Sequence, residues 1–180
     1  MRKDTGNSQG QSMFKETINQ LITNGENIAS KRIKFLLDKV DFNSIRIIMD
    51  IGSWHLKQTI EMSLIFPNAI IHAFEPNPET YLVCMNTRNS LPNNIKSRIF
   101  IHQVALSDKI GQVDFYPLDK SKTNSSNEGI ASLSPLKQDM DGSLLGDKWV
   151  QKKITVESST LDNWCYLNTV GPVDLIWMDV

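Results

Sequence analysis

The sequence contains few cysteines, little glycine and proline, and almost no excess charge. Neither of its two cysteines, Cys84 and Cys165, belongs to a CxxC pair, so the sequence predicts no zinc site and no disulfide framework. Nine glycines and seven prolines in 180 residues are too few for a collagen-like chain or a chain disordered throughout. The net charge of −1 gives no overall attraction to nucleic acid.

Long apolar runs are absent as well. No run approaches the roughly 18 residues of a membrane-spanning helix, and residues 1–12 are polar, without the apolar core of a secretory signal. We therefore expect a cytoplasmic protein with reduced thiols, which binds neither membrane nor nucleic acid and holds no metal. A length of 180 residues suits about one domain.

Residues 1–43 are expected to form a polar start followed by a helical cap. Two stripes of apolar residues repeat there with the helical period, and Asn24-Gly25 separates them. The members of the two stripes are Phe14, Ile18, Leu21 and Ile22, then Ile33, Leu36, Leu37 and Val40. One-sided helices of this kind pack on a neighbouring core, and they could also support a homodimer.

Residues 44–180 are expected to form one α/β domain, because short apolar runs alternate there with helical patterns. The predicted strands cover 45–49, 69–74, 97–106 and 173–178, and the predicted helices cover 54–66 and 79–91. This order predicts a parallel sheet with right-handed crossovers. On the first helix, Leu56, Ile60 and Leu64 are expected to face the core. Further along, the pattern predicts an antiparallel strand at 111–116, a loop at 120–129, a strand at 153–156 and a helix start at 158–164.

The chemistry is expected at the carboxyl ends of the strands, where open α/β sheets bind ligands. The residues in question are Asp50, Gly52 and Ser53, then Glu75 and Asn77, then Val104 and Ala105, and finally Asp179. Acidic residues at most of these ends suit a cationic ligand with hydroxyl groups and suit a pyrophosphate badly. His72, His102 and Cys84 fall inside predicted strands or helices, so we interpret them as packing residues.

Each strand end suits one part of a ligand. Gly52 permits a tight turn, and the free N–H groups of the following helix favour a carboxylate. Asp50 could pair with an ammonium group, and Glu75 could accept hydrogen bonds from ribose hydroxyls. An ammonium, a carboxylate, a ribose and a positive sulfur together describe S-adenosylmethionine.

A series of short motifs resembles one enzyme family, the FkbM-type S-adenosylmethionine-dependent methyltransferases. The motifs are Ile48-Met-Asp-Ile-Gly-Ser53, Phe66-Pro-Asn-Ala69, Ala73-Phe-Glu-Pro-Asn-Pro-Glu79, Val104-Ala-Leu-Ser-Asp-Lys-Ile-Gly111, Ser159-Thr-Leu-Asp162 and Val173-Asp-Leu-Ile-Trp-Met-Asp179. The resemblance implies a Rossmann-like, three-layer parallel sheet of the class I methyltransferase type. It also implies that Asp50, Gly52 and Ser53 meet the methionine end of the cofactor, that Glu75 holds the ribose, that Val104 and Ala105 border the adenine, and that Asp179 faces the reacting end.

The sequence departs from the family pattern in two places. Leu56 stands where the family usually has a second glycine, with Trp54 and His55 before it, so we expect a bulky loop that narrows the cofactor pocket. The sequence also stops at Asp179-Val180, inside a motif that continues in the family. We therefore expect that C-terminal strands of the family domain are missing and that the chain is a fragment of a longer protein.

The resemblance implies O-methylation of a hydroxyl on a small molecule or a glycan. Methyl transfer is an in-line displacement, so a base is needed only when the acceptor must lose a proton. The candidate bases are Asp179 and His55. One alternative is a nicotinamide-dependent oxidoreductase, but that class needs a GxGxxG turn, and Gly52 is the only glycine between Arg46 and Pro92. The other is a truncated or degenerate Rossmann-like domain that binds a partner without catalysis.

Overall fold

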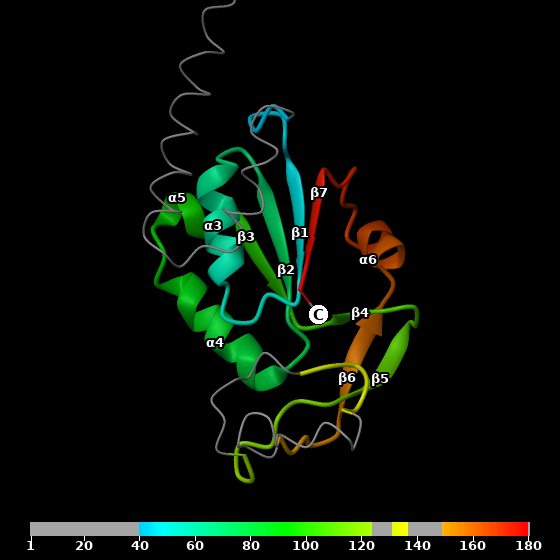
Figure 1. Ribbon diagram of the computed structural model, residues 1–180. Helices are drawn as coiled ribbons and strands as arrows, with labels where there is room; N and C mark the ends of the chain where they lie inside the picture. The colour runs from blue at the N-terminus through cyan, green and yellow to red at the C-terminus, as the bar shows by residue number, and fades with distance from the viewer. Residues whose placement is uncertain (1–39, 124–130, 137–148, 180) are drawn as a thin grey trace, which may run out of the picture.

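The computed structural model describes residues 40–123, 131–136 and 149–179 (Figure 1). Its main sheet contains β1 (Ile47–Ile51), β2 (Ile70–Phe74), β3 (Ile99–His102) and β7 (Leu175–Met178) in the order β3-β2-β1-β7. All neighbouring pairs are parallel. The predicted parallel α/β sheet is therefore confirmed. The predicted N-terminal helices, up to residue 39, and most of the predicted loop at 120–129 lie outside the described residues.

Helices cover both faces of this sheet, which gives three layers (Figure 1). On one side lie α3 (Lys57–Ile65), α4 (Pro78–Asn89) and the one-turn α5 (Asn93–Lys96), and on the other lies α6 (Leu161–Leu167). Each face has its own apolar core, as apolar runs buried on both sides predict. The α3 side buries Ile48, Met62, Phe66, Ile71 and Trp177, and the α6 side buries Met49, Ile51, Phe74 and Trp164.

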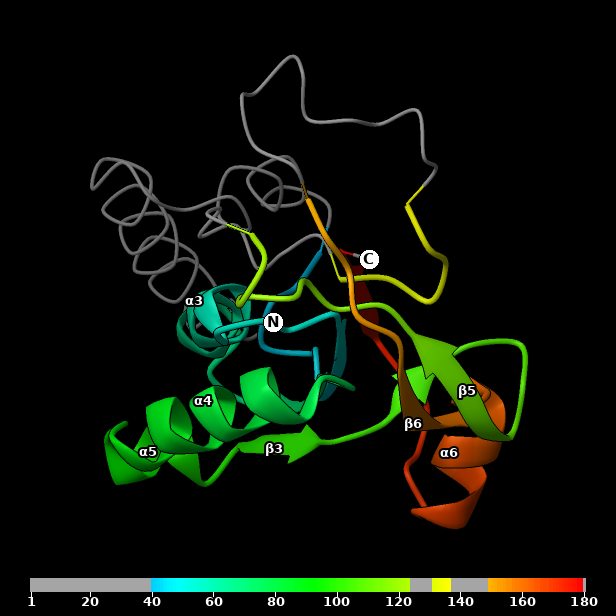
Figure 2. The same cartoon turned by 90° about the horizontal axis from the view of Figure 1, so that it is seen from below.

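A second, smaller sheet stands beside the carboxyl ends of the main strands. It contains β4 (Ala105–Leu106), β5 (Gly111–Phe115) and β6 (Ile154–Ser159) in the order β4-β6-β5, with β5 and β6 antiparallel. Figure 2 shows it from below, next to α6. The single strand predicted at 97–106 is wrong, because β3 ends at His102 and residues 105–106 pair with β6 instead. An apolar run marks extended backbone but does not reveal which sheet each part joins.

The helix predicted at 54–66 begins later than expected. Trp54 and Leu56 have φ values of +44° and +63°, in the left-handed region, so α3 starts only at Lys57. Its predicted apolar face is also wrong at one position, because Leu64 is 38% exposed while Met62 and Ile65 are buried. The helix predicted at 79–91 corresponds to α4, which ends at Asn89, and the one-turn α5 begins directly after Pro92.

Two histidines face the helix on the α6 side, as the sequence predicts. Nδ1 of His72 lies 3.0 Å from Nε2 of His102, and the indole of Trp164 meets both rings edge-on. Burial lowers the pKa of His102 to about 4, with a further contribution from His72. The pair is therefore uncharged at neutral pH and serves as part of the packing beneath α6. Among the described residues, no helix has both the length and the apolar character needed to cross a bilayer.

Arg98 joins the end of α3 to the start of β2. Its guanidinium donates to the carbonyl oxygens of Ser63 (2.9 Å), Phe66 (3.2 Å) and Ala69 (2.9 Å). These carbonyls lie at the last turn of α3 and in the turn that follows, where backbone acceptors have no helical partner. One side chain thus donates to three backbone acceptors, of which the Phe66 carbonyl also accepts from the N–H of Ala69 at 3.1 Å.

We expect Arg98→Ala to lower the free energy of unfolding by about 2–4 kcal/mol, because each lost bond has a charged donor and the partly buried carbonyls of Ser63 and Ala69 lose this donor. Urea denaturation followed by circular dichroism measures the change. Arg98→Lys should recover less than half of it, since an ammonium cannot reach three carbonyls in a plane. Lys109→Ala, at an exposed side chain, is the control and should change stability by less than about 0.5 kcal/mol. Equal effects of the two alanine variants would contradict this role.

Candidate functional site

A cavity of about 440 Å³ lies between the carboxyl ends of the main strands and the second sheet. This volume falls in the range of small-molecule and cofactor sites, about 300–1,000 Å³. The lining residues from the main sheet and its helices are Ile51, Gly52, Trp54, Gln58, Phe74, Glu75, Pro76, Thr80 and Asp179. Those from the second sheet and its flanking segments are Val104, Ala105, Leu106, Phe115, Ala131, Ser132 and Leu133.

The structure brings five of the predicted site residues into this lining. They are Gly52, Glu75, Val104, Ala105 and Asp179. Asp179 is exposed, and its backbone N–H donates to the carbonyl of Ile51 at 3.0 Å, so it stands beside the end of β1. The other predicted residues, Asp50, Ser53, Asn77 and His55, do not line the cavity.

Glu75 presents a buried carboxylate at the end of β2. Its Oε2 accepts from the backbone N–H of Trp54 at 3.1 Å, and its Oε1 accepts from that of Asn77 at 2.9 Å. Burial raises its pKa to about 7, although these two hydrogen bonds act in the opposite direction. The side chain is therefore held rigidly, and it retains lone pairs for a ligand.

Asp50 lies behind the cavity wall with only 1% of its surface exposed. Its Oδ2 accepts from the hydroxyl of Thr59, while Oδ1 has no hydrogen-bond partner. Burial raises its pKa to about 7; Thr59 opposes this shift and the negative charge of Asp179 adds to it. Asp50 is therefore too deeply buried to contact a ligand ammonium directly. When its carboxyl group is ionised, the negative charge still acts on the nearby cavity.

Ser53 and Asn77 have local structural partners. The Ser53 side chain is buried, and its hydroxyl donates to the carbonyl of Phe74 at 3.4 Å. Asn77 caps α4, with its Oδ1 accepting from the backbone N–H of Glu79 at 3.1 Å. Both residues shape the backbone around the site.

The loop after Gly52 differs from the sequence-based expectation. Leu56 is fully buried and packs against Ala73 and Cys84, so its side chain points into the core and does not narrow the cavity. The expected obstruction at Leu56 is therefore wrong. Trp54 lines the cavity instead, and the His55 ring stacks on it with centroids 4.4 Å apart.

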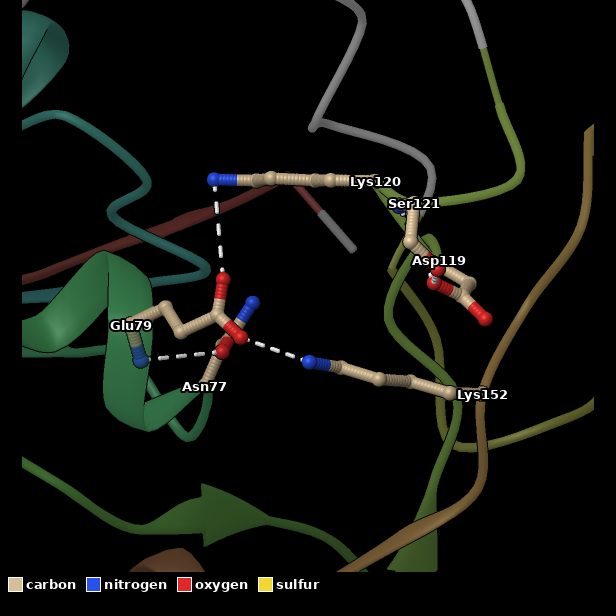
Figure 3. A network of polar contacts seen from close by, with 6 residues as sticks. All are labelled: Asn77, Glu79, Asp119, Lys120, Ser121 and Lys152. Atoms are coloured by element: carbon tan, nitrogen blue, oxygen red, sulfur yellow. Dashed lines mark hydrogen bonds and ion pairs between the residues drawn. The ribbon is translucent and has the colours of Figure 1, made fainter.

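An ion-pair network joins the first turn of α4 to the segments around the second sheet (Figure 3). The Glu79 carboxylate lies 2.6 Å from Nζ of Lys152 and 3.6 Å from Nζ of Lys120. Lys120 follows β5 and Lys152 precedes β6, so one carboxylate spans two segments next to the cavity wall. Because all three side chains are largely exposed, each pair contributes at most about 1 kcal/mol.

Sequence reasoning placed Trp54 in a loop beside the pocket but missed the lining residues Gln58, Thr80, Phe115 and Leu133. Gln58 and Thr80 lie near the starts of the helices that follow two predicted strand ends, so including the first turn of each helix would have found them. Phe115 and Leu133 carry no such signal, because their placement depends on how the second sheet folds over the main one. Among the described residues, no cluster of three or more histidine, cysteine or acidic side chains could hold a metal ion.

Comparison with known proteins points to one family. A family model described as the methyltransferase FkbM domain matches residues 49–180. A curated relative, 2-O-methyltransferase NoeI from Sinorhizobium fredii (strain NBRC 101917 / NGR234), is 31% identical over 159 residues, which cover 83% of this chain and 57% of the relative. The chain thus spans a little over half the length of that relative.

Two solved structures show weaker likeness. Precorrin-6y C5,15-methyltransferase from Geobacter metallireducens GS-15 is 20% identical, with a TM-score of 0.32 over 41% of this chain and 38% of that one. The glycopeptide N-methyltransferase MtfA, complexed with sinefungin, is 8% identical, with a TM-score of 0.36 over 81% of this chain and 75% of that one.

We expect Glu75 to make the protein less stable as the pH rises. Its pKa is about 7 in the folded state and near 4.5 when exposed. Between these pH values the folded state binds a proton that the unfolded state has lost, so the stability falls as the pH rises, and the stabilising contribution of Glu75 is gone above pH 7. The stability of the wild type relative to Glu75→Gln should therefore fall by about 2 kcal/mol between pH 5 and pH 8.5. Urea denaturation of both proteins across this range measures the slope. A constant difference between them would contradict the raised pKa.

Proposed function

Because the chain belongs to the FkbM methyltransferase family, we propose that it uses S-adenosylmethionine to methylate a hydroxyl oxygen of a small molecule or a glycan. The observation that carries this proposal is the charge of the cavity. Its lining contains the carboxylates of Glu75 and Asp179, and no lysine or arginine is found among the described lining residues. Such a cavity favours a ligand with a sulfonium and an ammonium group, and it disfavours the pyrophosphate of a nicotinamide cofactor.

The described residues fit this cofactor. Gly52 lines the cavity with a φ of +83°, a backbone conformation that residues with a side chain rarely adopt. Glu75 has free lone pairs for ribose hydroxyls, while Val104, Ala105, Leu106 and Phe115 supply apolar surface for a flat base. In this proposal Gly52 and the following backbone meet the methionine end, Glu75 holds the ribose, and the second sheet covers the adenine.

When bound, S-adenosylmethionine supplies a methyl group on a positively charged sulfur. The residues of the chain then have to orient the acceptor, keep out water and receive a proton. Asp179 is the proposed base, because it lines the cavity and is accessible to an acceptor. His55 is a weaker candidate, since its ring stacks on Trp54 and lies outside the lining.

The preference for an oxygen acceptor rests on the relative named 2-O-methyltransferase NoeI. A binding domain without catalysis was the other possibility, and one of its supports was an obstructed pocket. That support is gone, because Leu56 packs into the core and leaves a cavity of about 440 Å³. The methyltransferase proposal therefore accounts for more of the structure.

We expect calorimetric titration of the purified chain to show micromolar binding of S-adenosylhomocysteine and no binding of NAD. The physical reason is the acidic lining, which attracts the ammonium group of the first compound and repels the phosphates of the second. Circular dichroism establishes that the sample is folded. Tighter binding of NAD than of S-adenosylhomocysteine by a folded sample would overturn the proposed cofactor.

We expect Asp179→Asn to slow methyl transfer by about a hundredfold or more, since general-base catalysis typically contributes 10²–10⁴-fold. Transfer of a radiolabelled methyl group from S-adenosylmethionine to a panel of hydroxylated acceptors measures the rate. The matched variant His55→Gln should retain activity within about threefold, as His55 lies outside the lining. A larger loss for His55→Gln than for Asp179→Asn would reverse the two assignments.

A further inference from the structure

Trp54 holds an unusual position in the cavity wall. It is one of three non-glycine residues with positive φ among the described residues, and another of the three, Leu56, stands two positions away. Left-handed backbone is unfavourable for a bulky residue and tends to occur where a ligand is held. Trp54 also lines the cavity, so the strain lies at the site itself.

Hydrogen bonds hold both the N–H and the carbonyl of Trp54 in place. Its N–H donates to Oε2 of Glu75 at 3.1 Å, and its carbonyl accepts from the thiol of Cys84. Burial raises the pKa of Cys84 to about 12, so the thiol keeps the proton that it donates. These contacts hold the main chain of Trp54 in its left-handed conformation. Only the side-chain torsions of this residue are then left to change.

The indole N–H of Trp54 is buried and has no hydrogen-bond acceptor. Buried polar groups in folded proteins almost always have a partner, so this position of the ring is not one that satisfies the side chain. On one face the ring stacks on His55, an interaction that supplies no acceptor in the ring plane. The N–H can gain an acceptor only if the ring turns or if another group moves in.

We propose that Trp54 is a ligand-recognising residue of the cavity, whose indole ring turns when the ligand binds and donates its N–H to an acceptor atom of that ligand. The inference rests on the proposed function, because S-adenosylmethionine offers such acceptors in its carboxylate, its ribose and its adenine. Because the backbone of Trp54 is held, the indole ring turns about its side-chain torsions alone. The unpaired indole N–H favours the turned position of the ring once a ligand acceptor is present.

The test uses the full chain labelled with 5-fluorotryptophan, which places a fluorine reporter on each of its four tryptophans. The spectrum of Trp54→Phe assigns the Trp54 signal. On titration with S-adenosylhomocysteine, we expect that signal to move or to split. The signal of Trp164, which lies on the buried face of α6 and outside the lining, should stay in place.

Calorimetry on matched variants gives the second readout. Trp54→Phe keeps an aromatic ring but loses the N–H, so we expect about tenfold weaker binding of S-adenosylhomocysteine, the effect of one lost hydrogen bond. The ligand-free variant should be at least as stable as the wild type, since a buried, unpaired donor has been removed. Trp164→Phe is the control, with lower stability and an affinity within about twofold of the wild type. A merely structural role for Trp54 would give the pattern of the control.

The outcomes separate the two proposals. If S-adenosylhomocysteine binds while the Trp54 signal stays in place and Trp54→Phe keeps full affinity, the recognition role is wrong and the cofactor proposal stands. If the folded wild type binds no S-adenosylhomocysteine, both proposals fail. Movement of the Trp54 signal together with weaker binding by Trp54→Phe supports both.

Discussion

The parallel pairing of β1 between β2 and β7 is the constraint on which the site depends. In this register Ile51 lies beside Phe74 on one side and Met178 on the other, so the three strands end together. The acidic residues at those ends are thereby brought to one edge of the sheet, where Asp50 and Glu75 are buried. Burial raises the pKa of both Asp50 and Glu75 to about 7. The packing that stabilises the sheet therefore disfavours the charged forms of these two carboxyl groups, and a cationic ligand at this edge would stabilise them.

The loop after β1 takes its conformation from β2. The N–H groups of Gly52 and Ser53 both donate to the carbonyl of Phe74 at 3.1 Å, and the next N–H donates to Glu75. In the loop held this way, Leu56 has a φ of +63°, in the left-handed region. A left-handed residue costs about 1–2 kcal/mol, whereas full burial of a leucine side chain contributes about 1.5–3 kcal/mol. The contact of Leu56 with Ala73 and Cys84 offsets the backbone cost.

The main sheet and part of the site could be predicted from the sequence, because apolar runs and their ends are local signals. The positions of Gly52 and Glu75 follow from the rule that parallel strands end at one edge. The role of Asn77 could not be predicted, since the same side chain suits a helix cap and a ligand contact. Asp50 presents a similar problem, because its burial depends on the hydroxyl of Thr59, which lies nine residues later on α3. The contribution of Phe115 depends on how β5 pairs with β6, and pairing between distant segments leaves little trace in a single sequence.

The two halves of the cavity differ in chemistry because they belong to different sheets. The main sheet contributes carboxylates at the ends of buried strands, while the second sheet contributes apolar side chains such as Val104 and Phe115. The second sheet begins at β4, only two residues after β3 ends, so the apolar wall is tied covalently to the edge of the main sheet. The exposed ion pairs of Glu79 add a further link between α4 and the segments that flank the second sheet, and each is individually weak. Chain connectivity therefore helps to set the distance between the two carboxylates and the apolar wall that the second sheet contributes.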